Sequence, residues 1–206
     1  MACGAHADPL GPTPAQWRRG TMADAVALRL EDELATAALG AALANVLHAL
    51  ATKLRDHGFS LGLRGDLGAG KTALVRALLR RFGVAGTVKS PTFSLLEPYE
   101  LSRLHLYHFD FYRFKIPQEF EDRGFREYFA PGAVCLVEWP ERAAGYLPKS
   151  DMTIALRVEE LDVGENVDAA QLREPGRCAT VEAHTELGRQ CLQMLQDLWP
   201  RSSAAG

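Results

Sequence analysis

An uninterrupted motif at positions 65–72, Gly-Asp-Leu-Gly-Ala-Gly-Lys-Thr, restricts the possible folds of this chain more than any other feature. It fits G-x-x-x-x-G-K-[ST] at every fixed position. Residues 60–64 before it predict a strand, and residues 71–82 after it predict a helix closed by Gly83. Strand, glycine-rich turn and helix form the first unit of a nucleotide-binding α/β fold.

Each fixed residue type in this motif has a chemical role. Glycines let successive backbone N–H groups converge on phosphate oxygens, and the helix N-terminus adds its positive dipole end. Lys71 can reach the β- and γ-phosphates, and the Thr72 hydroxyl can bind Mg²⁺. The alternative is a glycine turn that merely joins strand to helix. The complete motif in its required context favours a nucleoside triphosphate site.

Two further predicted strands end on an acidic residue. Residues 104–109 run into Asp110, and residues 133–138 end on Glu138. Because the carboxyl ends of parallel strands form the ligand crevice of an open sheet, both carboxylates are expected beside a Mg²⁺-triphosphate. One can hold the metal while the other orients the attacking water, although solvated loop carboxylates remain the alternative. The sequence leaves open which one touches the metal.

Other candidates surround these acids in the sequence. Residues 90–93, Ser-Pro-Thr-Phe, lie where many such enzymes place a loop that senses the γ-phosphate, although a simple Ser/Pro turn that enters a strand is the alternative. Trp139 could stack on a base or pack in the interior. For His105 and Tyr107 we expect structural roles.

The remaining pattern predicts one domain without internal repeats. We expect a three-layer P-loop α/β fold whose mostly parallel, mixed central sheet is flanked by helices. It spans residues 22–199, with a disordered extension at 1–21, a flexible tail at 200–206 and a native start at Met22. The predicted strands are 25–30, 60–64, 92–98, 104–109, 133–138, 152–158 and 178–183, and the predicted helices are 31–57, 71–82, 117–129 in short pieces, and 184–198.

Composition narrows the class of protein. The chain has 206 residues, of which 47% are hydrophobic and 24% charged, the balance of a soluble globule. Its net charge of −3 disfavours direct, unaided binding to nucleic acid. Four cysteines without a C-x-x-C pair indicate reduced thiols in the cytoplasm. Residues 34–52 carry no formal charge, but their bulky residues recur at helical spacing, which predicts a buried helix rather than a membrane span.

Four motifs together resemble the TsaE (YjeE) family, the ATPase component of the bacterial machinery that makes N6-threonylcarbamoyladenosine (t6A) at tRNA position 37. The matching segments are residues 65–72, 88–93, 107–113 and 136–140, in the family's order and spacing. The resemblance implies a P-loop protein that binds ATP and Mg²⁺ and hydrolyses ATP slowly by itself. It also implies docking on the TsaB–TsaD heterodimer, which ATP hydrolysis resets for turnover. Contact with tRNA is then only indirect, through the complex, and no membrane contact is implied.

The resemblance also implies residue roles. The phosphate cradle is Leu67, Gly68, Ala69, Gly70, Lys71 and Thr72; Thr72 and Glu138 hold Mg²⁺; Asp110 and Thr92 serve hydrolysis, with Ser90 in the same switch-like loop; Trp139 and Glu33 lie near the nucleotide. Residues 176–181 depart from the family pattern, so a nucleotide contact from Arg177 stays open.

Two other functions could use the same loop. A small P-loop kinase would pass the γ-phosphoryl group to a metabolite or nucleotide, but it usually needs an arginine-bearing lid, and no Arg-rich lid segment appears between the predicted strands. A non-catalytic, ATP-dependent interaction module would keep the site without turnover. A GTPase is less supported, since the chain lacks an Asn/Thr-Lys-x-Asp element.

Overall fold

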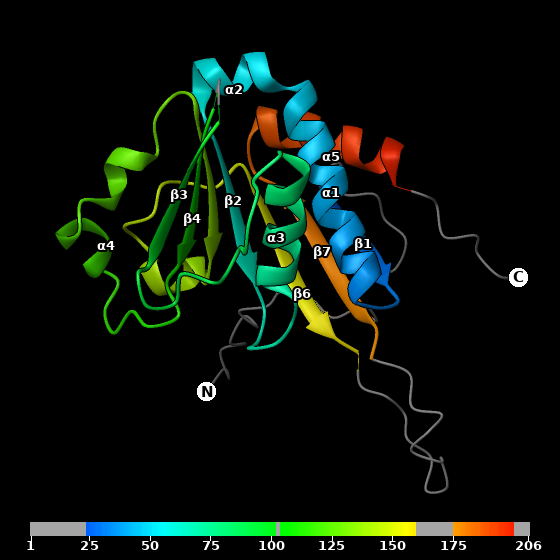
Figure 1. Cartoon of the computed structure of the whole chain (residues 1–206), viewed down its shortest axis with the longest axis horizontal. Coiled ribbons are helices and arrows are strands. Elements are labelled where there is room, and N and C mark those ends of the chain that lie inside the picture. Colours follow the sequence, from blue (N-terminus) through cyan, green and yellow to red (C-terminus); the bar gives the residue numbers. More distant parts are fainter. Residues whose placement is uncertain (1–23, 102–103, 160–174, 200–206) are drawn as a thin grey trace, which may run out of the picture.

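A computed structural model describes residues 24–101, 104–159 and 175–199, which build a seven-stranded sheet in the order β1-β7-β6-β2-β5-β4-β3 (Figure 1). The four central strands β6, β2, β5 and β4 are parallel, and the pairings toward both edges are antiparallel. The predicted α/β fold with a mixed sheet is confirmed. The strands are β1 (Ala25–Leu30), β2 (Phe59–Arg64), β3 (Leu96–Glu100), β4 (His105–Asp110), β5 (Ala133–Glu138), β6 (Met152–Val158) and β7 (Arg177–Ala183).

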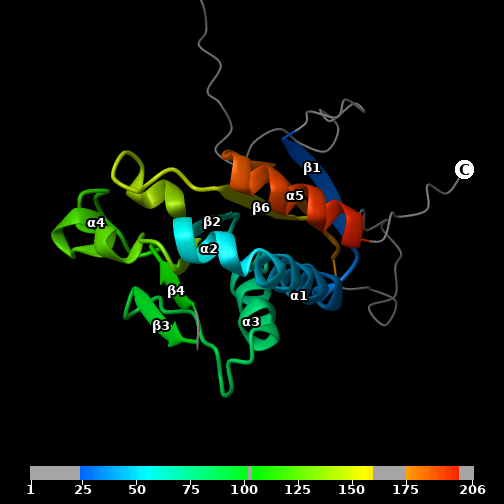
Figure 2. The same cartoon turned by 90° about the horizontal axis from the view of Figure 1, so that it is seen from above.

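Helices cover both faces of this sheet. Figure 2 shows the layers from above. One face packs against three longer helices through a leucine-rich core, and the segments 111–129 and 139–147 cover part of the other face through an aromatic cluster. The helical elements are α1 (Glu33–Ala49), α2 (Ala51–His57), α3 (Lys71–Arg81), α4 (Glu119–Asp122), α5 (Glu186–Leu198) and the 3₁₀ turns η2 (Phe125–Tyr128) and η3 (Pro140–Ala143).

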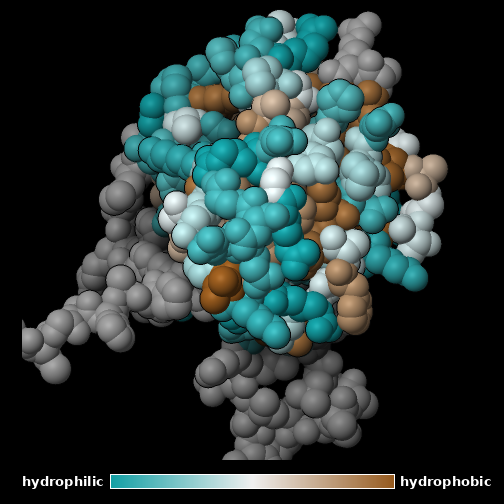
Figure 3. Space-filling model, turned by 90° about the vertical axis from the view of Figure 1, so that its left-hand side faces the viewer, coloured by the Kyte–Doolittle hydropathy of each residue, from teal (hydrophilic) through white to brown (hydrophobic). Residues whose placement is uncertain are grey.

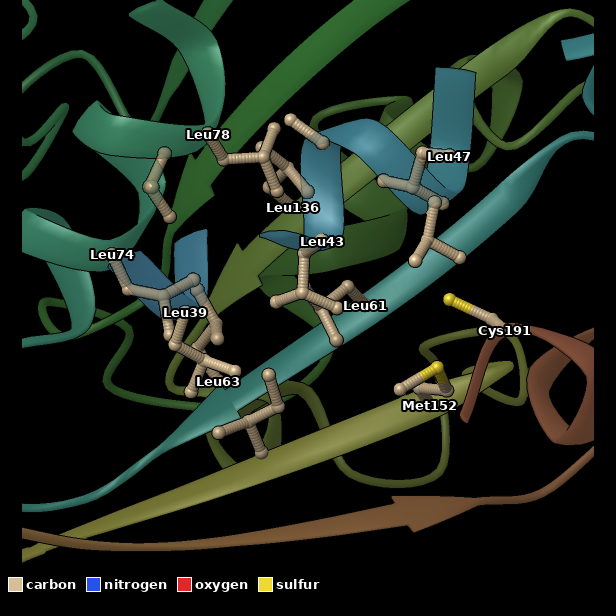
Figure 4. Packing of buried hydrophobic residues seen from close by; sticks show 14 of the residues in the cluster. Leu39, Leu43, Leu47, Leu61, Leu63, Leu74, Leu78, Leu136, Met152 and Cys191 are labelled. Carbon is tan, nitrogen blue, oxygen red and sulfur yellow. The ribbon is translucent and has the colours of Figure 1, made fainter. Parts of the chain in front are cut away.

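Period-two alternation in the central strands separates the two cores. Leu61 and Leu63 of β2 and Leu136 of β5 point into the leucine core, where they meet α1 and α3 (Figure 4). Their neighbours Cys135 and Val137 face the aromatic cluster. Every residue of β5 is buried, as expected for a central parallel strand covered on both sides. The carboxyl ends of β2, β4 and β5 are therefore held by packing on both faces.

Helix α1 is fixed at its start and in its middle. The Asp32 carboxylate accepts the Ala35 N–H at 2.7 Å and so caps the helix. Further along, α1 and α3 approach so closely that a Cβ on Gly40 would lie 2.3 Å from the carbonyl oxygen of Leu74. The start of α3, where the glycine-rich motif ends, is thus positioned by direct backbone packing against α1.

The predicted single helix over 31–57 is wrong, because it divides at Leu50 and its two parts meet at 76°. Neither proline nor glycine marks this break. The bend lets Leu54 stay fully buried while its carbonyl accepts N–H groups from Gly58 and Gly132, so tertiary packing decides it. Within the described ranges, no single helix is long and apolar enough to cross a membrane, although α1 and α2 pass a length and composition test as a bent pair.

The strand predicted at 92–98 begins only at Leu96. Residues 92–94 form a turn, and Leu95 follows with φ at 66° while its N–H bonds to the carbonyl of Pro91. Intrinsic strand propensity does not predict this turn, because the Thr92 hydroxyl bonds to Asp110, which is distant in the sequence.

Residues 1–21, Met22 and 200–206 lie outside the described residues. The surface on the α4 side is mainly hydrophilic, with hydrophobic residues in small separate areas (Figure 3).

Candidate functional site

A pocket opens where the carboxyl ends of β2, β4 and β5 meet the start of α3. It brings together all but one of the sequence-predicted site residues; the exception, Ala69, is buried in the loop beneath. The lining residues are Glu33, Thr36, Leu67, Gly68, Gly70, Lys71, Thr72, Ala73, Arg76, Ser90, Thr92, Asp110, Tyr112, Glu138, Trp139 and Arg177.

The loop between β2 and α3 has the backbone that its glycines predict. Gly65 has φ at 132°, and a Cβ there would lie 2.3 Å from the carbonyl oxygen of Leu156 on the neighbouring strand. Only glycine fits this position. The chain then turns directly into α3 at Lys71, so the unpaired N–H groups of the first helical turn face the pocket. This arrangement favours an anion.

Lys71 is buried inside this loop. Its ammonium group donates hydrogen bonds to the carbonyls of Gly65 at 2.6 Å and Asp66 at 2.8 Å, and lies 4.0 Å from the centre of the Trp139 indole. Burial lowers the pKa of Lys71, while the charges of Glu138 and Asp110 act in the opposite direction. The Lys71 ammonium is thus near enough to both carboxylates for their charges to act on its pKa.

Thr72 and Glu138 form a buried pair at the base of the pocket. The Thr72 hydroxyl lies 2.8 Å and 3.0 Å from the two carboxylate oxygens of Glu138. Glu138 is buried, with 2% of its surface exposed. Because the hydroxyl hydrogen points to the carboxylate, the lone pairs of the Thr72 oxygen remain available to a metal ion. His108 contacts the same carboxylate at 2.9 Å, a contact that sequence reasoning missed.

Asp110 has a different set of partners. Its Oδ2 accepts hydrogen bonds from the hydroxyls of Ser90 and Thr92, the latter at 2.7 Å, and its Oδ1 accepts the Tyr112 N–H at 3.0 Å. The predicted switch-like loop is therefore connected directly to the end of β4. The two acids lie side by side, since Asp110 pairs with Glu138 in the register of β4 and β5.

The outer wall of the pocket combines aromatic and charged groups. Trp139 has a left-handed backbone, with φ at 59°, and its ring lies 5.2 Å from that of Tyr112. Glu33, which is predicted to lie near the nucleotide, is exposed at the start of α1 and lines the same pocket. Arg177 enters from β7; its Nε and Nη1 atoms are buried and have no hydrogen-bond partner among the described residues. Two buried guanidinium nitrogens without a described partner, on a side chain that lines a pocket, fit an anionic ligand.

The donor set of this pocket fits Mg²⁺ bound together with phosphate. Magnesium at nucleotide sites uses one or two protein oxygens and takes the remaining ligands from phosphate and water. Thr72 and Glu138 supply such oxygens. Nowhere in the described ranges do three or more His, Cys, Asp or Glu side chains gather as a metal cage.

His105 and Tyr107 do not line this pocket. His105 is exposed, and Tyr107 packs edge-on against Tyr128 with ring centres 4.8 Å apart, in keeping with the structural role expected for it. Among the lining residues, pattern reasoning did not assign Thr36, Ala73, Arg76 and Tyr112 and left Arg177 open. It also missed His108, which contacts Glu138 from outside the pocket lining.

The fold and the loop at 65–72 define a P-loop protein of the α/β class. A sequence model for "Threonylcarbamoyl adenosine biosynthesis protein TsaE" matches residues 30–166. The chain belongs to the TsaE family, which confirms the resemblance.

Two similar proteins carry the name of the family, and a third has a solved structure. The tRNA threonylcarbamoyladenosine biosynthesis protein TsaE of Haemophilus influenzae is 39% identical over 139 residues, covering 68% of this chain and 85% of the relative. The TsaE protein of Treponema pallidum is 42% identical over 106 residues, covering 52% and 78%. The crystal structure of Bacillus subtilis YdiB superposes with a TM-score of 0.62 at 25% identity, covering 84% of this chain and 95% of YdiB.

Proposed function

We propose that this chain is the Mg²⁺-dependent ATPase subunit required for t6A modification of tRNA position 37. The names of its relatives support the pathway. The observation that carries the proposal is the buried contact between Thr72 and Glu138 beside Lys71, at the start of the helix that follows the glycine-rich loop. This combination suits a triphosphate bound with its metal ion.

ATP is the proposed substrate, and its phosphates would lie on the residues 67–72. Backbone N–H groups at the start of α3, the Lys71 ammonium and the Arg177 guanidinium would meet the phosphate charge. Lys71 must then exchange its contacts with the carbonyls of Gly65 and Asp66 for phosphate oxygens. Trp139 and Glu33 would lie at the nucleoside side of the pocket.

Thr72 and Glu138 would hold Mg²⁺. When bound, the ion neutralises negative charge on the phosphates. The residues of the chain contribute the positions of the two oxygens, because Thr72 is fixed on the first turn of α3 and Glu138 ends a fully buried strand. Burial of Glu138 excludes bulk water from one side of this contact.

Asp110 is the proposed hydrolytic residue, assisted by Thr92. A carboxylate can orient the attacking water or accept its proton. In this structure both hydroxyls of the loop 90–92 occupy one oxygen of Asp110. Hydrolysis would require that loop to release Asp110, which would make the intrinsic rate low and dependent on a partner. Ser90 and Thr92 thereby connect the state of the loop to the reacting carboxylate.

The proposed partner is the TsaB–TsaD heterodimer, which ATP hydrolysis by this subunit would reset for a further turnover. Contact with tRNA would be indirect, through the complex, in the cytoplasm. The net charge of −3 agrees with this arrangement, because a subunit whose tRNA is held by its partners needs no strongly basic surface.

One assay tests this function. Phosphate release from ATP and Mg²⁺ is measured with the full chain alone, with TsaB–TsaD, and with Lys71→Ala as the matched inactive control. We expect slow release alone and clear stimulation by the heterodimer. Equal rates with and without the heterodimer would contradict the partner assignment, and transfer of phosphate to an added small acceptor would identify a kinase instead.

A further inference from the structure

His108 is a fully buried imidazole that the proposed reaction does not use. It lies in the middle of β4 with none of its surface exposed, and its Nε2 is 2.9 Å from Oε1 of Glu138. A histidine in such a position needs a reason, because burying a polar ring costs free energy unless its hydrogen bonds are made.

The sheet register places this histidine behind the metal-binding acid. Parallel pairing of β4 with β5 sets Asp110 opposite Glu138, and His108 is two residues earlier on the same face as Asp110. His108 is therefore the diagonal neighbour of Glu138, two residues nearer the start of β4 than Asp110. Each of the two acids has its own support: Asp110 is held by the loop 90–92, and Glu138 by His108 and Thr72.

The unused ring nitrogen indicates which atom carries the proton. Nδ1 of His108 is buried and has no partner in the described part of the chain. A proton there would be a buried donor without an acceptor, so the neutral ring with its hydrogen on Nε2 satisfies more of the groups present. In that form the Nε2–H of His108 donates to Oε1 of Glu138.

We propose that His108 is a positioning residue for Glu138, an inference that rests on the proposed Mg²⁺-dependent function. Its N–H fixes Oε1, which would leave Oε2, whose one described hydrogen-bond partner is the Thr72 hydroxyl, to hold the metal ion. Partners behind a ligating group typically change metal affinity by about 10- to 100-fold. His108 contacts neither phosphate nor metal and acts through the carboxylate.

The test separates the contribution of the metal from that of the nucleotide. The affinity of the full chain for a non-hydrolysable ATP analogue is measured by calorimetry in Mg²⁺ and in EDTA. The ratio of the two affinities gives the contribution of the metal ion to binding. His108→Leu should keep its affinity in EDTA but lose the Mg²⁺-dependent gain by about 10-fold or more. His108→Gln, which can place an N–H near the position of Nε2, should restore most of that gain. His105→Leu, an exposed histidine on the same strand, is the control.

Further variants keep the proposal open to refutation. In a Glu138→Gln background, adding His108→Leu should change the Mg²⁺ ratio no further. If His108→Leu does not fold, His108→Gln is compared with the shorter His108→Asn, and equal Mg²⁺ ratios for these two would overturn the proposal. An unchanged ratio in folded His108→Leu, or equal losses in Mg²⁺ and EDTA, would also overturn it. A wild-type chain that binds no nucleotide in either condition would instead overturn the proposed function together with this inference.

Discussion

The Thr92 hydroxyl donates a 2.7 Å hydrogen bond to Oδ2 of Asp110, across a gap of 18 residues in the sequence. The same oxygen accepts the Ser90 hydroxyl, while the Tyr112 N–H holds the other one. All three contacts restrain a carboxylate that is only 3% exposed. The loop after α3 and the segment after β4 can therefore respond together to whatever group approaches Asp110.

Replacing Asp110 should separate binding from hydrolysis. Asp110→Asn keeps the size of the side chain and removes its charge, so nucleotide affinity should stay near that of the wild type. Phosphate release in the presence of TsaB–TsaD should fall by about 10²- to 10⁴-fold, the usual loss for a general base. Asp122→Asn, an exposed acid on α4, is the control. Normal turnover by Asp110→Asn would make the residue structural.

Lys71→Ala should remove productive ATP binding. Truncating one member of a buried charge pair costs about 2 to 5 kcal/mol, which corresponds to a loss in affinity of about 30-fold or more. Calorimetry with the ATP analogue measures this loss. Lys53→Ala, which removes an exposed ammonium that contacts Gln190, serves as the comparison. Unchanged affinity after Lys71→Ala would place the phosphates elsewhere.

Arg177→Ala should have opposite effects on the free and the loaded protein. Two guanidinium nitrogens are buried without partners in the described structure, so their removal should leave the melting temperature of the free chain unchanged or raise it. Affinity for the nucleotide should decrease by about 10-fold, since a charge-assisted hydrogen bond contributes about 1.5 to 3 kcal/mol. Thermal unfolding with and without nucleotide reads both effects. A parallel decrease in stability and affinity would indicate a structural arginine.

Two leucines on α1 provide a test of the core. Leu43 is fully buried against the sheet, whereas Leu34 is 79% exposed. Leu43→Ala should lower the free energy of unfolding by about 2 to 5 kcal/mol through lost burial and a cavity. Leu34→Ala should change it by no more than about 0.5 kcal/mol. Chemical denaturation gives both values, and similar losses would contradict the packing described here.

Stability should decrease in mild acid through His184. Burial lowers the pKa of His184 below 6.5, and its Nε2 lies 2.9 Å from the Thr153 hydroxyl. Below pH 6.5 the unfolded chain takes up this proton before the folded chain does, so the free energy of unfolding falls as pH drops through that window. His184→Gln should flatten this slope. Denaturation midpoints measured from neutral pH to below pH 6.5 give the slope of stability against pH. An equal slope in the variant would refute the assignment to His184.

Much of the site could be predicted because its signals are local. The motif at 65–72 requires glycine at fixed positions, and Gly65 indeed faces a strand backbone too close for any side chain. Asp110 and Glu138 could be assigned because strand ends in a parallel sheet share one edge. Such inferences need only spacing and the direction of the strands.

The other site residues depend on information that a pattern does not contain. His108 reaches Glu138 only through the register between β4 and β5, and Arg177 comes from a strand far away in the sequence. The break at Leu50 has no proline or glycine, and follows from the burial of Leu54. In each case a tertiary contact decides the outcome, which intrinsic propensity cannot report.

The contact at Gly40 has a mechanical consequence. Since the backbone of α1 touches that of α3 without an intervening side chain, the two helices behave as one stiff unit that carries Lys71 and Thr72. If the chain binds a triphosphate as proposed, a shift on binding would fall on the opposite wall of the pocket, where Ser90, Thr92 and Tyr112 lie. A partner that responds to the nucleotide would then contact that wall rather than the helical side.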